Sequence, residues 1–117
     1  MLKKYLKNGK RNMEYNIKLT AEFLNEIDTI CNYIENVLKS KGAANRLREK
    51  VMYNVLLLEN SPKIFSEIEK IDDEKRIYRR MPVNNYIVLY TIDEESKTTF
   101  VAHIYYGKRD YMGNNLL

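Results

Sequence analysis

The chain has 117 residues and a formal net charge of +4, and 44% of its residues are apolar. These values suit one folded domain with a single core, and they exclude a disordered, collagen-like or low-complexity chain. With one cysteine and one histidine, the chain can build neither a disulfide framework nor a cysteine–histidine zinc site by itself. No apolar run approaches the ~20 residues of a membrane span and no signal peptide is evident, so we expect a cytoplasmic protein without membrane contact.

The positive charge is concentrated in the first twelve residues. Of the 20 basic and 16 acidic residues in the chain, 5 basic and no acidic ones lie here, so the rest of the chain has a balance of −1. A basic arm of this kind contacts nucleic acid or an acidic partner in some proteins, and in others it is a solvated tail. We therefore expect a flexible N-terminal extension, residues 1–12, and one domain, residues 13–117.

Residues 13–19 alternate apolar and polar side chains, and this period of two predicts a half-buried strand. Thr20 follows directly and can accept a hydrogen bond from a backbone N–H, as the N-cap of a helix does. An apolar stripe that starts at Leu24 then repeats with helical spacing and includes Cys31 as a small packed side chain. Gly42 suits the end of this first helix.

A second apolar stripe begins almost at once, at Ala44, and ends before Asn60-Ser61-Pro62. Because the connection is short, the two helices are expected to form an antiparallel hairpin. Residues 61–75 are expected to be a less regular connector. Three β-like segments follow in close order, joined by two tight turns: 77–83, 86–92 and 98–106.

These elements predict an α+β domain with the order β-α-α-β-β-β. The helical hairpin would cover one face of a small, mostly antiparallel sheet. A partner would then bind the other face of the sheet or its rim. The arrangement alone does not assign a function, because one fold supports many activities.

Two arginines stand side by side on the first of these three strands. Because neighbouring side chains on a strand point to opposite faces, Arg79 and Arg80 cannot both face one partner. A guanidinium with unused donors binds a phosphate through paired hydrogen bonds, whereas one opposite a carboxylate forms a cross-strand ion pair. Both alternatives stay open for each arginine.

The segment 105–111, with the sequence YYGKRDY, interleaves three tyrosines with two cations directly after a strand. Aromatic rings stack on unpaired bases while cations meet phosphates, so the pattern suits a strand of RNA. It suits a protein–protein hot spot equally well. The candidate binding residues here are Tyr105, Lys108, Arg109 and Tyr111.

His103 is the single histidine, and strand alternation predicts that it shares a face with Val101 and Tyr105. Histidine is the usual acid or base near neutral pH, but in a strand it also serves as a structural hydrogen-bond partner. The sequence shows no glycine-rich phosphate loop, no serine-centred nucleophile motif and no acidic metal motif. We therefore expect no cofactor and no metal.

Several segments together resemble a known family. Residues 78–90 (YRRMPVNNYIVLY) and 104–110 (IYYGKRD) look like the meander of RelE/ParE toxins, and residues 15–20 (YNIKLT) and Ser61-Pro62 also match. The resemblance extends over residues 13–113 and implies the element order given above. Toxins of this family are encoded beside an antitoxin that wraps and neutralises them, so the resemblance implies a cognate antitoxin as partner.

The family has two branches with different targets. The RelE branch cleaves messenger RNA in the ribosome, whereas the ParE branch arrests growth by binding DNA gyrase. The RelE branch commonly has a basic residue where this chain has Ile87 after Tyr86, while residues 81–83 (MPV) and the long hairpin are more similar to the ParE branch. The resemblance therefore favours gyrase inhibition, with a metal-independent endoribonuclease that acts on the ribosome as the alternative.

A nuclease of this kind needs cations that stabilise charge on the attacked phosphate and an acid that protonates the leaving oxygen. The resemblance implies that these roles fall to a catalytic set of Arg80, His103, Arg109 and Tyr111. For binding of the target, the expected residues are Arg79, Tyr105 and Lys108.

Overall fold

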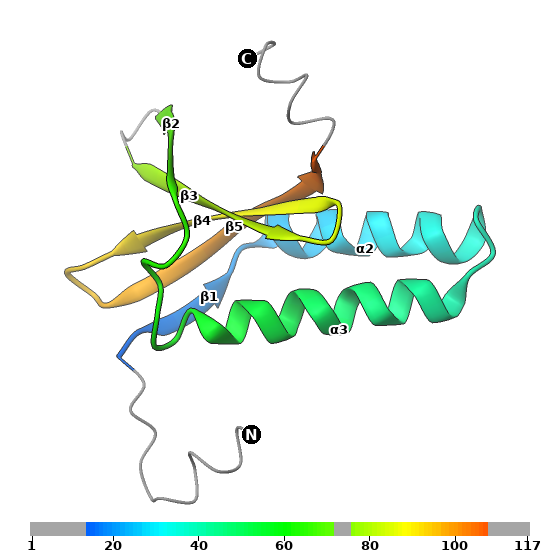
Figure 1. Cartoon of the computed structure of the whole chain (residues 1–117), viewed down its shortest axis with the longest axis horizontal. Coiled ribbons are helices and arrows are strands. Elements are labelled where there is room, and N and C mark those ends of the chain that lie inside the picture. Colours follow the sequence, from blue (N-terminus) through cyan, green and yellow to red (C-terminus); the bar gives the residue numbers. More distant parts are fainter. Residues whose placement is uncertain (1–13, 72–75, 108–117) are drawn as a thin grey trace, which may run out of the picture.

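The computed structural model describes residues 14–71 and 76–107 of the chain. In this part, two helices pack on one face of a five-stranded sheet (Figure 1). The elements in chain order are β1 (Asn16–Leu19), α2 (Ala21–Asn36), α3 (Lys41–Leu57), β2 (Glu67–Ile71), β3 (Ile77–Val83), β4 (Tyr86–Asp93) and β5 (Thr98–Tyr106). The α+β class, with a helical hairpin on a mostly antiparallel sheet, is as the sequence predicts.

The sheet has the strand order β1-β5-β4-β3-β2, in which β1 runs parallel to β5 and the other pairs are antiparallel. β1 pairs with β5 only from Thr98 to Val101. The second half of β5 therefore has no strand neighbour on that side. The hairpin of α2 and α3 extends beyond this end of the sheet (Figure 1).

The helix ends follow local capping signals. The side chain of Thr20 accepts a hydrogen bond from the backbone N–H of Phe23 at 3.1 Å, which confirms it as the N-cap of α2. The prediction that Gly42 ends this helix is wrong, because α2 already ends at Asn36 and Gly42 lies in the first turn of α3. Lys39 takes the left-handed backbone conformation (φ 54°) in the connection, and Ser40 caps α3. Neither α2 nor α3, the helices of the described part, is long and apolar enough to cross a membrane.

The core lies between the hairpin and the sheet. α2 contributes Phe23, Ile27 and Cys31, α3 contributes Val51 among others, and all are almost fully buried. The sheet side of this core consists of Met81, Val83, Val88, Tyr90, Val101 and Ile104. Leu24, predicted to start the apolar stripe, is instead 44% exposed, because the helix turns Phe23 toward the sheet. Burial raises the pKa of the Cys31 thiol, as suits a packed side chain.

The prediction of an irregular connector over residues 61–75 is wrong in part, because the strand β2 lies within this range. It pairs with the outer side of β3, where Glu67 lies opposite Arg79 and Ile71 opposite Ile77, with an irregular register between them. Its sequence, EIEKI, has only two apolar residues, so local pattern gave little reason to expect a strand. The strand forms because β3 offers an unpaired edge to it.

A β-bulge in β5 changes which side chains face the helices. Tyr90 of β4 pairs with Val101 and the next residue, Leu89, pairs with His103, so Ala102 is the extra residue. Val101 belongs to the core under the helices, whereas Tyr105 packs on a small cluster of the opposite face: Tyr78, Ile87, Leu89 and Ala102. The prediction that Val101, His103 and Tyr105 share one face is therefore wrong for Val101, because the bulge interrupts the alternation. His103 and Tyr105 pair with Leu89 and Ile87, two residues of the face opposite to the helices.

Candidate functional site

The guanidinium of Arg79 is engaged inside the chain. Its Nη1 donates hydrogen bonds to the backbone oxygens of Phe65 at 2.6 Å and Lys63 at 3.2 Å, and its Nη2 lies 3.0 Å from a carboxylate oxygen of Glu67. The side chain is only 17% exposed. Arg79 thus attaches the segment before β2 to the sheet, and in this arrangement its donors do not face a phosphate.

Tyr90 reinforces the same attachment from the neighbouring strand. It is the register partner of Arg79, and its buried phenol donates a hydrogen bond to the backbone oxygen of Pro62 at 2.6 Å. Burial raises the pKa of Tyr90 to about 12, against the opposing charge of Arg79. Residues 62–65 are therefore held on the sheet by two side chains from two adjacent strands.

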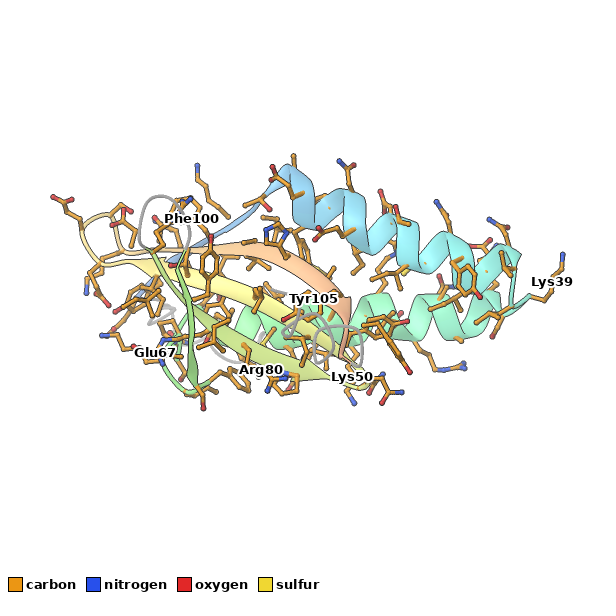
Figure 2. All side chains as sticks on the ribbon, turned by 90° about the horizontal axis from the view of Figure 1, so that it is seen from above. Lys39, Lys50, Glu67, Arg80, Phe100 and Tyr105 are labelled. Carbon is orange, nitrogen blue, oxygen red and sulfur yellow. The ribbon has the colours of Figure 1, made fainter. Side chains whose placement is uncertain are left out.

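Arg80 points to the face of β3 opposite to Arg79. On this face it lies beside Leu89, its register partner on β4. Figure 2, which looks down on the sheet, shows Arg80 and Tyr105 over it. Within the described residues, the half-buried guanidinium of Arg80 has no hydrogen-bond or ion-pair partner. Arg80 is therefore the one predicted cation in the described strands whose donors are unused.

His103 lies at the open edge of β5, where it is paired with a glutamate of α2. Its Nδ1 is 3.1 Å from Oε2 of Glu26, and Oε1 of the same carboxylate accepts a hydrogen bond from the backbone N–H of Ile104 at 3.0 Å. Both side chains are 39% exposed. Glu26 is a residue that sequence reasoning missed, because its partners lie 77 and 78 positions further along the chain.

The structure does not bring the described members of the predicted catalytic set together. Leu89 of β4 is the register partner of both Arg80 on β3 and His103 on β5, so β4 lies between the two residues. His103 is paired with Glu26 at the open edge of β5, and no hydrogen bond joins it to Arg80 within the described residues. Three further predicted site residues lie outside the described part: Lys108, Arg109 and Tyr111.

Gly107 fixes the point from which the chain continues toward those residues. Its backbone N–H donates a hydrogen bond to the oxygen of Asn85 at 2.7 Å, and a Cβ at this position would lie 3.0 Å from the same oxygen. Only glycine allows this close approach without a shift of the backbone. The chain thus leaves the sheet beside the β3–β4 turn, in which Asn84 has the positive φ (57°) that the sequence suggested.

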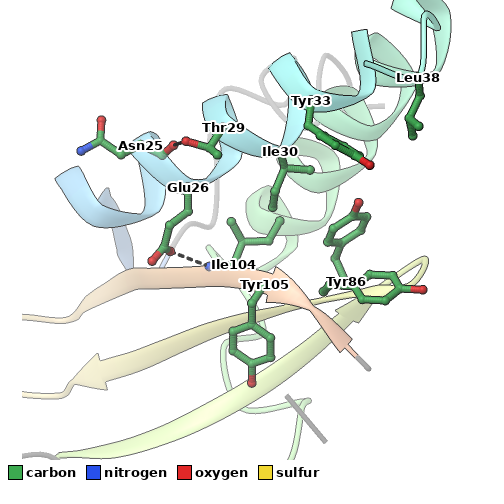
Figure 3. Close-up of a pocket in the computed structure, with 10 residues that line it drawn as sticks. Asn25, Glu26, Thr29, Ile30, Tyr33, Leu38, Tyr86, Ile104 and Tyr105 are labelled. Carbon is green, nitrogen blue, oxygen red and sulfur yellow. Dashed lines mark hydrogen bonds between the residues drawn. The ribbon is translucent and has the colours of Figure 1, made fainter. Parts of the chain in front are cut away.

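A cavity of about 850 Å³ lies between α2 and the unpaired half of β5 (Figure 3). The side chains of Ile30, Tyr33, Tyr86, Ile104 and Tyr106 give it a largely apolar and aromatic wall, and Glu26 lines the same cavity. The rings of Tyr86 and Tyr106 meet edge to face, 5.6 Å apart. Burial raises the pKa of Tyr86, so its phenol stays neutral at physiological pH. Glu26, Ile30 and Tyr33 stand four and three residues apart, a spacing that places them on one face of a helix. This spacing is the feature of the sequence from which the groove could have been found.

Residues 14–71 and 76–107 contain no group of three or more histidine, cysteine or acidic side chains that could hold a metal ion. The predicted site residues and their neighbours in the described part therefore offer an apolar groove, an acid–histidine pair and the unpartnered Arg80.

Comparison with known proteins places this geometry in a family. The family model of the ParE toxin of type II toxin–antitoxin systems matches residues 17–111. No curated protein sequence matches the chain.

Among the solved structures that are similar to the chain are three toxin–antitoxin systems, all at low sequence identity. The chromosomal ParDE toxin–antitoxin system from P. aeruginosa has a TM-score of 0.64 at 13% identity, over 80% of this chain and 96% of that one. The archaeal RelE–RelB complex from Pyrococcus horikoshii OT3 has a TM-score of 0.57 at 15% identity, over 83% and 99%. The complex RelBE2 from Mycobacterium tuberculosis has a TM-score of 0.53 at 14% identity, over 81% and 93%.

These likenesses confirm the fold. The family match extends from β1 through the whole sheet and past the end of β5. The chain therefore belongs to the ParE toxin family of type II toxin–antitoxin systems.

Proposed function

We propose that this toxin arrests growth by binding DNA gyrase, and that a cognate antitoxin neutralises it. The observation that carries the choice of target is the internal use of two predicted site residues: His103 is paired with Glu26, and Arg79 is bonded to backbone oxygens of the segment before β2. Gyrase inhibition by binding requires a contact surface and no proton transfer. The ParE family match supports the same target, since the resemblance associates that branch with gyrase.

RNA cleavage places stricter demands on geometry. A cation and a proton donor must meet at one phosphate to within hydrogen-bond distance. Among the described residues, Arg79 is bonded to backbone oxygens and His103 is paired with Glu26, while Arg80 lies on β3, separated from His103 by β4. This part of the molecule provides no such pair, which supports inhibition by binding.

The groove between α2 and β5 suits the antitoxin. The structural neighbours include complexes of a toxin with an antitoxin, and a segment that wraps a toxin needs an apolar surface in which to bury side chains. The groove offers tyrosine and isoleucine side chains beside unpaired backbone of β5. We therefore propose this groove as the antitoxin site.

One observation favours the alternative, a RelE-like endoribonuclease dependent on the ribosome. Arg80 keeps its donors unused, which is what contact with a phosphate requires. In that case Arg80 and Arg109 would stabilise the phosphate, and His103 or Tyr111 would carry the proton.

Two assays with one preparation distinguish these targets. Purified toxin is added to DNA gyrase in a supercoiling assay and to translating ribosomes in a messenger RNA cleavage assay. We expect loss of supercoiling and intact messenger RNA. Cleavage on ribosomes that Arg80→Ala or Arg109→Ala abolishes, without an effect on gyrase, would instead establish the nuclease.

The domain division is tested with the same assays. We propose that residues 13–117 form the toxin domain, so a chain that starts at Met13 should inhibit its target as well as the full chain does. Loss of inhibition in this shortened chain, with an unchanged melting temperature, would assign the basic arm to the target contact.

A further inference from the structure

The outer surface of α3 carries four side chains in one stripe that faces away from α2. Arg46, Lys50, Tyr53 and Leu57 stand at spacings of four, three and four residues, so they share one face of the helix. All four are exposed, Tyr53 at 59% and Leu57 at 41%. Figure 2 shows Lys50 on the side of α3 away from α2. We call these four residues the α3 stripe.

The two cations of the α3 stripe form no ion pair within the described residues. Arg48 lies on the face of α3 toward α2, because it forms an ion pair with Asp28 of α2 at 3.0 Å. Arg46 and Lys50, in contrast, have no ion-pair partner among the described residues, and the exposed Glu49 between them pairs with neither. The stripe therefore presents two positive charges followed by two apolar side chains.

The distribution of charge on the hairpin is uneven. α2 has four acidic residues and no basic one, whereas α3 has four basic residues and one acidic one. The groove proposed for the antitoxin lies on the α2 side, where Glu26 is. The hairpin thus has two chemically different flanks, and two different partners can bind it.

We propose that the α3 stripe is the surface that binds DNA gyrase, through an acidic and partly apolar face of that enzyme. The inference rests on the proposed function and names the contact. Charge complementarity identifies the partner surface: carboxylates would meet Arg46 and Lys50, and apolar side chains would cover Tyr53 and Leu57. Arginine and tyrosine are also the residue types that most often contribute large binding energies at protein interfaces.

The same stripe is a poor surface for DNA. Leu57 gains nothing from a phosphate backbone, and Tyr53 could use only its hydroxyl there, so the apolar part of the stripe would stay uncovered. Outside the first twelve residues the chain has a balance of −1, so the body lacks the excess of positive charge that non-specific DNA binding requires. A protein surface therefore accounts for the whole stripe, whereas a nucleic acid leaves its apolar part without a partner.

The test is a charge reversal with a matched control on the same hairpin. Arg46→Glu/Lys50→Glu reverses the stripe, and Lys39→Glu/Lys41→Glu makes the same change of charge at the tip of the hairpin, outside the stripe. The full-length proteins are compared in the gyrase supercoiling assay, with circular dichroism melting to verify the fold. We expect the half-inhibitory concentration to rise about tenfold or more for the stripe variant and to change less than about twofold for the tip variant.

Two further measurements separate the charged part of the contact from the apolar part. The defect of the charge-reversed stripe should shrink as salt is raised, because exposed charges are screened. The defect of Tyr53→Ser should persist at high salt, since it removes apolar contact. A fluorescence anisotropy assay with labelled duplex DNA, without gyrase, should give the same weak signal for both double variants.

The outcomes separate this inference from the function on which it rests. If the wild-type toxin fails to inhibit gyrase, the proposed function is wrong and the stripe loses its role with it. If wild type inhibits gyrase and Arg46→Glu/Lys50→Glu inhibits equally well, the stripe inference alone is overturned. It is also overturned if the stripe variant loses affinity for DNA in the absence of gyrase, or if the tip variant shows the same defect.

Discussion

The carboxylate of Glu26 accepts a hydrogen bond from the backbone N–H of Ile104 at 3.0 Å and thereby joins α2 to β5. The bond lies beyond Val101, where β5 no longer has β1 beside it. The carboxylate therefore fills the place that a backbone oxygen of a further strand would take. Its other oxygen contacts His103 at 3.1 Å, so one side chain of α2 holds both residues that follow the bulge.

Replacement of Glu26 by alanine removes this acceptor. We expect the free energy of unfolding to fall by about 1 to 2 kcal/mol, because a backbone donor loses its partner. Hydrogen exchange measured by NMR should show a less protected Ile104 amide. Glu26→Gln keeps a side-chain oxygen and should restore most of the protection. An Ile104 amide that is equally protected in wild type and in Glu26→Ala would contradict this role.

Arg79 and Arg80 form a natural pair of test and control. Arg79→Ala removes the donor to the backbone oxygens of Lys63 and Phe65, and we expect it to lower the free energy of unfolding by about 2 kcal/mol. Arg80→Ala removes no such bond, so its effect on stability should stay within about 0.5 kcal/mol. Urea denaturation at pH 7 measures both. Equal losses for the two variants would mean that Arg79 does not hold the segment before β2.

The buried phenol of Tyr90 makes stability depend on pH in the alkaline range. Its pKa is about 12 in the folded protein and about 10 in the unfolded chain, so only the unfolded chain loses this proton between these values. The contribution is therefore complete below pH 10 and is lost as the pH rises toward 12. Tyr90→Phe should be less stable than wild type at pH 8, through loss of the bond to Pro62.

The measurement for Tyr90 is the change in unfolding free energy between pH 9 and pH 11. Wild type should lose more stability over this interval than Tyr90→Phe, by on the order of 1 kcal/mol, since other groups titrate alike in both proteins. Identical pH profiles for the two proteins would show that the phenol is not held neutral by burial.

Phe23 and Leu24 test which residue of α2 enters the core. Phe23 is fully buried, and Phe23→Ala should cost about 3 to 5 kcal/mol, through lost burial and the cavity left behind. Leu24 is 44% exposed, so Leu24→Ala should cost less than about 1 kcal/mol. Thermal or urea unfolding compares them directly. A larger loss of unfolding free energy for Leu24→Ala than for Phe23→Ala would mean that Leu24 enters the core, as the sequence pattern predicts.

Features with a local cause could be predicted from the sequence. The bounds of β3 and β5 coincide with the predicted segments 77–83 and 98–106, because bulky alternating side chains and turn residues define them within a few positions. Thr20 was recognisable as a helix N-cap for the same reason, since its bond reaches only to Phe23. The resemblance to RelE/ParE toxins rested on such contiguous segments.

The candidate site was less predictable because its geometry depends on distant partners. The sequence placed His103 with Val101 and Tyr105, but the bulge at Ala102 puts Val101 on the other face, and His103 is paired with Glu26 of α2. The sequence left open which of Arg79 and Arg80 forms an internal contact. The answer depends on β2, which covers the edge of β3, and on the segment before β2, whose backbone Arg79 binds.

The sequence by itself determined the helical hairpin, the family and the order of every element except β2, since these depend on patterns within short stretches of chain. Only the tertiary structure decided that Glu26 meets β5, that Arg79 is engaged and that Arg80 is not. Each of these outcomes depends on a contact between residues 12 to 78 positions apart. Such contacts depend on how the bulge and the edge strand set the register, and no local pattern encodes that register.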